Sequence, residues 1–344
     1  MKTIWLHIVR FYIRFGLNCY YRQFKVYNTQ HIPQDKPVLF LPNHQNALID
    51  PLLIATKSGR FLYFLTRASV FKKPMVSKFL HGLQMLPVYR IRDGWSNLNN
   101  NKSIFETCAN LLKSNQAIVV FPEGSHHINR TVRPLSKGFT RIVFEALDTY
   151  PNTDLQLIPV GINFRKSEDF EDSTTVFFGE PIAAQNYKDL ERHEAIVNLK
   201  KDVQRAIAEL TTDIPAESYS RTLKRLEEHH VDFLDPQSVN QCIRSNFANC
   251  VKKPKPRRSL LRPIFRGVLM FCFIVPFIVW RTFVKPKIKE IEFMATFRFA
   301  IYITLFPIWF FCLILAIRLL IDVQTALIFG IAIAAISWLY VKKL

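Results

Sequence analysis

Four short runs dominated by apolar residues stand out in the hydrophobic pattern of the first half of the chain. They occupy residues 38–41, 86–92, 117–121 and 157–162. Short apolar runs between turn-forming residues predict buried strands. The first and third runs end in polar residues at 43–50 and 123–125, and polar groups at the carboxyl ends of neighbouring strands are typical of an open α/β sheet. We therefore predict an α/β fold, an open sheet flanked by helices.

Helical spacing marks the segments around these strands. Apolar residues recur at intervals of four and three between residues 199 and 210, and residues 139–147 follow Gly138 with the same period. At the N-terminus, one helical face carries Trp5, Ile8, Val9, Tyr12 and Ile13, while His7, Arg10, Arg14 and Asn18 lie opposite. This pattern predicts an amphipathic helix over residues 1–24 that lies in a membrane interface, or one that packs on the neighbouring domain.

Three longer apolar runs lie near the C-terminus, beyond a segment at 216–262 that we expect to be a helical and basic linker. Residues 267–280 lie between two arginines and are shorter than the roughly 20 residues of a bilayer-spanning helix, so a re-entrant or interfacial segment is expected. Residues 299–317 and 325–341 predict a helical membrane hairpin within 299–341. The whole region 263–344 is therefore predicted to be membrane-associated.

The charge of the chain indicates which partners the C-terminal region is expected to bind. The 344 residues carry a formal net charge of +19. From residue 252 onward there are 15 Lys and Arg against 3 Asp and Glu, which gives +12. Basic residues beside apolar runs favour anionic membrane lipids, and no nucleic-acid-reading module accompanies them, so nucleic acid is not an expected partner. Their placement beside the apolar runs puts both ends of the hairpin in the cytoplasm.

The cysteine and histidine positions predict neither a disulfide framework nor a metal site. The six cysteines are scattered without a CxxC pair, so they are expected to be reduced. Glu123, His126 and His127 are potential ligands, but no second cluster in the sequence completes a site. We therefore predict no metal and no cofactor.

His44 and Asp50, just after the first predicted strand, are the strongest candidates for chemistry. A histidine that titrates near neutrality can take a proton from an alcohol, and a carboxylate can fix its tautomer. The alternative is structural: His44 is a buried, hydrogen-bonded side chain, and Asp50 before Pro51 is a helix N-cap.

Four motifs in order favour the chemical interpretation. They are Asn43-His44 with Asp50, Pro87-Val88 with Arg90, Phe121-Pro122-Glu123-Gly124, and Ile158-Pro159-Val160. In these motifs and their spacing, residues 20–215 resemble the glycerophospholipid acyltransferase family, whose members acylate glycerol-3-phosphate and lysophosphatidate. The resemblance implies that residues 25–215 form the catalytic domain, that His44 is the general base oriented by Asp50, and that Arg90, Glu123 and Gly124 bind the acceptor. Arg92, Arg130, Arg133 and Lys137 are secondary candidates for substrate binding.

The chain departs from the commonest family pattern in three places. Five residues instead of four separate His44 from Asp50, Gln84 stands where a glycine is usual, and Ser125 replaces the common threonine after the third motif's glycine. Residues six apart do not share a helix face, so a loop is expected between His44 and Asp50. The longer spacing resembles a branch that includes glycerol-3-phosphate acyltransferases.

The resemblance implies a membrane-bound O-acyltransferase of phospholipid biosynthesis. Its donor would be acyl-CoA or acyl carrier protein, and its acceptor glycerol-3-phosphate, lysophosphatidate or a non-phosphate lyso-lipid, among which the sequence does not choose. A catalytically inactive membrane scaffold is the alternative. Because the thioester donor is cytosolic, we expect an integral protein of the inner (cytoplasmic) membrane with its active site facing the cytoplasm.

Overall fold

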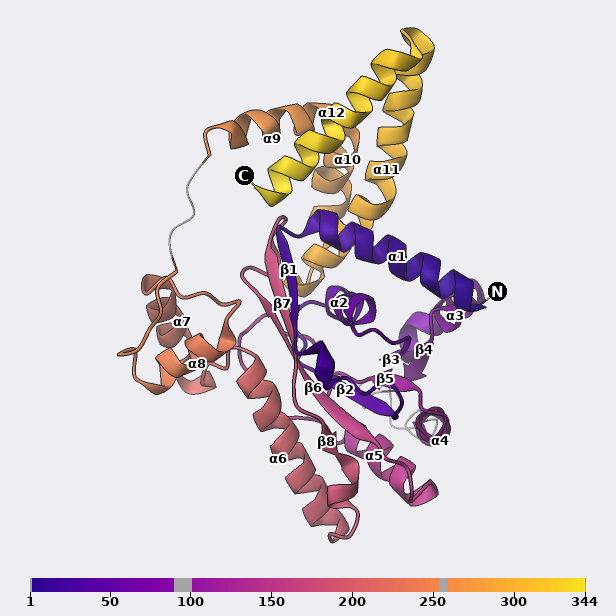
Figure 1. The fold of residues 1–344 in the computed structure, drawn as a ribbon, viewed down its shortest axis with the longest axis vertical. Helices are drawn as coiled ribbons and strands as arrows, with labels where there is room; N and C mark the ends of the chain where they lie inside the picture. The colour runs from indigo at the N-terminus through magenta and orange to yellow at the C-terminus, as the bar shows by residue number, and fades with distance from the viewer. Residues whose placement is uncertain (1, 90–100, 254–258, 344) are drawn as a thin grey trace.

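An eight-stranded sheet forms the centre of the molecule (Figure 1). The computed structural model describes residues 2–89, 101–253 and 259–343. The strands are β1 (Gln23–Tyr27), β2 (Val38–Pro42), β3 (Leu62–Arg67), β4 (Met85–Val88), β5 (Ala117–Val119), β6 (Gln156–Phe164), β7 (Ser173–Phe178) and β8 (Ile182–Ala183). Their order is β1-β7-β6-β2-β5-β3-β4, with β8 beside β6. The predicted open α/β sheet is confirmed.

Strand β2 lies in the middle of the sheet and is buried along its whole length. It runs parallel to β5 on one side and to β6 on the other, with Val38 paired to Ala117 and to Gln156. Parallel neighbours bring their carboxyl ends to one edge. This register places the segments that follow β2 and β5, which contain His44 and Glu123, next to each other.

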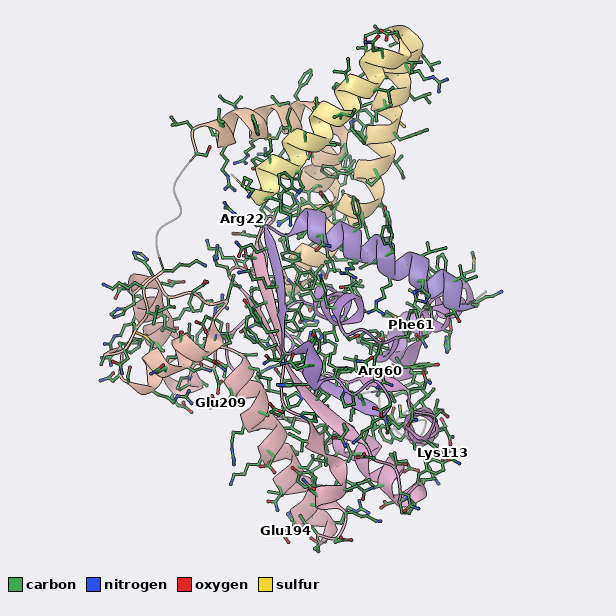
Figure 2. The ribbon with its side chains drawn as sticks, in the orientation of Figure 1. Arg22, Arg60, Phe61, Lys113, Glu194 and Glu209 are labelled. Atoms are coloured by element: carbon green, nitrogen blue, oxygen red, sulfur yellow. A yellow bond between two sulfur atoms is a disulfide. The ribbon has the colours of Figure 1, made fainter. Side chains whose placement is uncertain are left out.

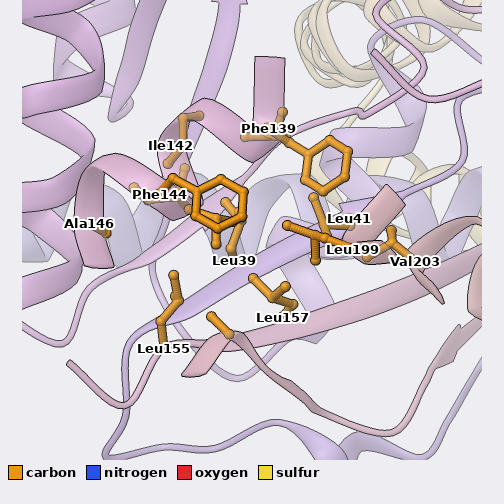
Figure 3. Packing of buried hydrophobic residues seen from close by; sticks show 14 of the residues in the cluster. Leu39, Leu41, Phe139, Ile142, Phe144, Ala146, Leu155, Leu157, Leu199 and Val203 are labelled. Carbon is orange, nitrogen blue, oxygen red and sulfur yellow. The ribbon is translucent and has the colours of Figure 1, made fainter. Parts of the chain in front are cut away.

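Helices pack on both faces of this sheet, and further helices extend beyond it. The helices are α1 (Lys2–Tyr20), α2 (Ile49–Lys57), α3 (Pro74–Gly82), α4 (Asn101–Lys113), α5 (Gly138–Thr149), α6 (Arg192–Leu210), α7 (Tyr219–Glu228), α8 (Pro236–Arg244), α9 (Leu261–Cys272), α10 (Ile274–Ile278), α11 (Met294–Leu320) and α12 (Val323–Lys342). Successive side chains of a strand point to opposite faces. Leu39 and Leu41 therefore pack with α5 and α6, as Figure 3 shows, and share their core with α4. Val38 and Phe40 pack with α1, α2 and the start of α11.

Helix α1 packs on the domain through the buried side chains of Leu17 and Tyr20, with Ile13 against the same core, and polar residues add contacts near its N-terminal end. Arg10 donates a hydrogen bond to the Arg60 carbonyl oxygen at 3.3 Å, and the His7 ring meets Phe61 edge-on at 4.7 Å, at the place labelled in Figure 2. The opposite side exposes a row of large apolar residues: Ile4, Trp5, Ile8, Phe11, Tyr12 and Phe15. The helix is thus docked on the domain, as one of the two alternatives predicts, and it also presents an apolar face outward; its place in a membrane interface stays a prediction.

Residues 214–250 form a small packed unit, whereas the sequence predicted a linker over 216–262. Helices α7 and α8 enclose a core of Ile214, Leu226, Phe233, Val239 and Cys242. Within it, Cys242 and Cys250 form a disulfide, so the prediction that all cysteines are reduced is wrong for this pair. The chain reverses tightly after α8, where Asn246 and Phe247 have φ of 49° and 69°. This reversal brings the Cα atoms of Cys242 and Cys250 to 4.5 Å from each other, a proximity that their sequence spacing does not reveal.

The C-terminal region projects away from the sheet as a helical hairpin (Figure 1). Among the described residues, Ile291–Leu320 and Val323–Lys342 are long and apolar enough to cross a membrane. Helices α9 and α10 form a pair bent by 94°, which makes a broken span or a re-entrant loop over the region where the sequence predicted a re-entrant or interfacial run. The expected hairpin is present, and the turn between its helices is shorter than expected, at Ile321 and Asp322.

Candidate active site

The end of β2 delivers His44 to the carboxyl edge of the sheet. The side chain of Asn43 fixes that end, because it donates to the Ile162 carbonyl oxygen at 3.0 Å and accepts from the Ile162 N–H at 2.7 Å. The chain then leaves the strand through a loop, and α2 begins at Ile49. Asp50 therefore lies in the first turn of α2, where the helix dipole favours a carboxylate.

Asp50 lies fully buried behind His44 and holds the loop between them. Its Oδ2 atom is 2.9 Å from His44 Nδ1 and accepts the N–H groups of Gln45 and Asn46, both at 2.8 Å. An ionised carboxylate only accepts hydrogen bonds, so the Nδ1 atom carries the proton and Nε2 keeps its lone pair. Because residues 45–48 form a loop and not a helix, His44 and Asp50 are in direct contact although they are six positions apart.

Two rings frame His44. Phe121, just after β5, stacks on its imidazole at 3.9 Å between ring centroids, and the His126 ring meets it edge-on at 5.6 Å. The His44 backbone oxygen accepts the His127 N–H at 2.9 Å. The His44 side chain is 14% exposed, so its ring is fixed by neighbours and remains accessible. Sequence reasoning missed Phe121 in this role, because an aromatic residue at the end of a strand is ordinarily a core residue.

Glu123 is buried beside His44 and paired with Arg133. Arg133 Nε lies 2.6 Å from Glu123 Oε2, and the same guanidinium donates to the Ser125 hydroxyl at 2.8 Å and to the Ser125 carbonyl oxygen. Burial raises the pKa of the Glu123 carboxyl, and the Arg133 guanidinium and then His44 oppose that rise. The pair orders the turn that carries the third motif.

The remaining predicted binding residues lie in different surroundings. Gly124 has a φ of 74°, a conformation that favours glycine, which explains its place in the turn. Arg130 donates to the carbonyl oxygens of Phe164 and Arg165 at 2.9 and 2.8 Å, so its guanidinium secures the end of β6. Lys137 is exposed at the start of α5. Arg90 and Arg92 lie outside the described residues.

His126 meets two carboxylates that the sequence did not associate with it. One ligand atom each of His126, Glu290 and Glu292 lie within 4.8 Å of one another. The sequence shows no second ligand cluster nearby, and the structure supplies one from residues 164 and 166 positions further along the chain. Burial lowers the pKa of His126, His44 lowers it further, and Glu290 and Glu292 act in the opposite direction.

A small polar pocket opens beside His44. Its lining includes Asn43, His44, Gln45, Glu123, His127, Asn129, Thr131, Val132, Thr211 and Thr212. Gln45, Asn129 and Thr131 carried no signal in the sequence, because isolated polar residues in loops are common. The donors and acceptors of these residues, with the His44 imidazole among them, fit proton transfer from a hydroxyl group.

Comparison with known proteins finds similarity to acyltransferases over part of the chain. The acyltransferase family model matches residues 23–163. An uncharacterized acyltransferase of Schizosaccharomyces pombe is 30% identical over 103 residues, which cover 28% of this chain and 15% of that protein. Glycerol-3-phosphate O-acyltransferase 1 of Saccharomyces cerevisiae is 31% identical over 71 residues, covering 21% and 9%. The matched segment is thus a small part of these relatives' length.

Among solved structures, the chain is similar to the 1-acyl-sn-glycerophosphate (LPA) acyltransferase PlsC from Thermotoga maritima, with a TM-score of 0.39 and 19% identity. That likeness covers 55% of this chain and 72% of the other. The residues matched by the family model contain all of the first three motifs and Ile158-Pro159-Val160, and the motif residues His44, Asp50 and Glu123 lie side by side. Residues 23–163 therefore match an acyltransferase domain, and over that segment the chain is similar to glycerol-3-phosphate acyltransferases.

Proposed function

We propose that this protein transfers a fatty acyl chain from the thioester of acyl-CoA or acyl carrier protein to a hydroxyl group of a glycerophosphate-type acceptor. The 2.9 Å contact between His44 Nδ1 and the buried Asp50 carboxylate is the observation that carries the proposal. It leaves Nε2 as the proton acceptor within a family domain whose members transfer acyl groups.

The transfer needs no covalent enzyme intermediate. His44 Nε2 takes the proton of the acceptor hydroxyl while its oxygen attacks the thioester carbonyl carbon, and Asp50 stabilises the imidazolium. The new C–O bond forms, the C–S bond breaks, and the proton passes from His44 to the leaving sulfur. The products are the ester and the free thiol, and His44 returns to its starting state.

The acceptor's phosphate would be bound mainly by Arg90, which matches the family position for that role. Arginine suits a phosphate because its planar guanidinium donates two parallel hydrogen bonds. Glu123 and Gly124 would shape the acceptor pocket. Arg133 and Arg130 already donate to Glu123, Ser125 and backbone oxygens, so we assign them to ordering the site, with Arg92 and Lys137 as secondary phosphate contacts.

Glycerol-3-phosphate is the acceptor that we favour. Two yeast relatives are named glycerol-3-phosphate O-acyltransferases, and the five residues between His44 and Asp50 resemble that branch. Lysophosphatidate is the second candidate, because the exposed apolar face of α1 and the hairpin suit an acceptor held in a bilayer.

The test is a panel of acceptors with the purified full-length protein in detergent–lipid micelles. Labelled acyl-CoA and acyl carrier protein are each offered glycerol-3-phosphate, lysophosphatidate and a lyso-lipid without phosphate, and a His44→Ala preparation is the blank. We expect transfer to a phosphate-bearing acceptor above the blank. Transfer to the phosphate-free acceptor alone would contradict the proposed acceptor class, and no transfer to any acceptor would leave the inactive scaffold as the explanation.

A further inference from the structure

The first turns of the membrane helix α11 are built into the catalytic domain. Ala295 and Phe299 are 1% and 2% exposed and belong to the same core as Phe40 of β2 and Ile49 of α2. Phe299 also meets Tyr20 of α1 edge-on at 5.3 Å. A segment that only anchored the protein would have no need to bury these side chains beneath the sheet.

Thr296 reaches the catalytic loop directly. Its hydroxyl oxygen accepts the backbone N–H of Leu48 at 3.2 Å. Leu48 immediately precedes α2, and N–H groups at a helix start lack partners within their own helix. A residue 248 positions away thus supplies the acceptor for the loop that joins His44 to Asp50.

A second connection runs through the loop after β6. Arg298 donates to the Glu168 carbonyl oxygen at 2.8 Å. The preceding residue, Ser167, offers its own carbonyl oxygen to the Asn46 side chain, also at 2.8 Å. The N–H of Asn46 is one of the two loop amides that donate to Asp50. Through Glu168 and Ser167, Arg298 therefore helps to hold the loop between His44 and Asp50.

A third connection reaches the His44 ring through His126. Phe293 packs edge-on against His126 at 5.0 Å, and Glu290 Oε2 lies 3.7 Å from His126 Nε2. His126 in turn meets the His44 ring. The three connections converge on His44 and Asp50 from one continuous segment, residues 290–299.

We propose that Thr296 is a positioning residue for the His44–Asp50 pair and that residues 290–299 complete the acyl-transfer site. The inference deepens the proposed acyl transfer and rests on it. A catalytic group displaced by about 1 Å can lose about a hundredfold in rate, so one hydrogen bond to this loop affects turnover. The membrane hairpin is then part of the catalytic unit, and the position of His44 depends on it.

The experiment removes the Thr296 hydroxyl without changing its shape. We compare Thr296→Val with Thr304→Val, a matched control two turns along α11 whose hydroxyl donates only to Ala300 of its own helix among the described contacts. In Thr296→Val we expect kcat to fall about tenfold or more with the donor KM unchanged. Thr296→Ser keeps the hydroxyl and should restore most of the rate, and Thr304→Val should match the unsubstituted protein.

Equal kcat for Thr296→Val and Thr304→Val would overturn the inference, while acyl transfer by the unsubstituted protein would still uphold the proposed function. Hydrogen exchange gives a readout that needs no activity. We expect faster amide exchange at residues 44–50 in Thr296→Val than in Thr304→Val, and equal exchange would overturn the inference. If Thr296→Val does not fold, Thr296→Ala takes its place in both measurements.

Discussion

At the scale of single residues, Glu123 and Arg133 form a buried ion pair beside His44. The Glu123 side chain is 4% exposed and that of Arg133 28%. Replacing Arg133 by methionine leaves a buried carboxylate without its cation, which costs about 3 kcal/mol. We predict a lower midpoint of urea unfolding for Arg133→Met, and partial recovery in Arg133→Met with Glu123→Gln. Equal midpoints for Arg133→Met and the unsubstituted protein would refute the pairing.

Asp172 carries a prediction about pH. Its buried carboxyl accepts the Lys166 N–H at 3.0 Å, and burial raises its pKa from 3.8 to about 7. Between these pH values the unfolded chain has lost the proton and the folded protein retains it, so stability falls as pH rises through this window and then levels off.

Asp172→Asn removes this titration and keeps an oxygen acceptor. We predict that the stability of Asp172→Asn relative to the unsubstituted protein increases between pH 4 and pH 7, by on the order of 4 kcal/mol, and changes little above that. Thermal unfolding of both proteins across pH 4 to 9 is the measurement. Parallel curves would show that Asp172 titrates normally.

Contacts between individual residues could be predicted from the sequence where the two partners are close in the chain. His44 and Asp50 are six residues apart and follow a recognisable strand, so their contact could be expected. The contacts of His126 with Glu290 and of Leu48 with Thr296 join residues 164 and 248 positions apart. No local pattern encodes such contacts, because they depend on how α11 packs.

At the scale of elements, Gly16 lies where α1 packs against Phe299 and Ile303 of α11. A Cβ atom at Gly16 would lie 2.7 Å from Ile303 Cγ2, closer than real contacts allow. We predict that Gly16→Val separates the helices, destabilises the protein by about 1–3 kcal/mol and lowers acyl transfer. Gly267→Val in α9 is the control, because a Cβ there meets no atom within 4 Å and the change in helix propensity is the same. Equal melting temperatures for the two variants would contradict this packing.

The extent of a helix or strand could be predicted from the sequence where the whole segment is buried in the same core. Strands β2 and β6 are buried throughout, so their apolar runs matched their extents closely. Helix α11 begins at Met294, before the apolar run at 299, because its first turns pack on the core of the domain through Ala295 and Phe299. Helix α9 includes Arg262 and Arg266, which interrupt the hydropathy pattern without breaking the helix.

At the scale of the whole molecule, the hairpin and the exposed face of α1 predict one orientation in the membrane. The turn at Ile321 and Asp322 should lie across the membrane from Lys343 and from the catalytic domain. We predict that a cysteine at Gln324, in a background whose free cysteines are serine, reacts with an impermeant thiol reagent only from outside the cell. A cysteine at Lys343 should react only after the cell is opened. Labelling of both from the same side would overturn the arrangement.

The central claim is that His44 and Asp50 act as one proton-transferring unit, and a cycle of His44→Ala, Asp50→Asn and the double variant tests it most directly. The measurement is kcat for acyl transfer to the best acceptor, with exposed His193→Ala in α6 as the control. We predict a loss of about 10²–10⁴-fold for His44→Ala, a smaller loss for Asp50→Asn, and no further loss in the double variant, because Asp50 acts through His44. Transfer by His44→Ala at the rate of the control, or losses that multiply in the double variant, would contradict it.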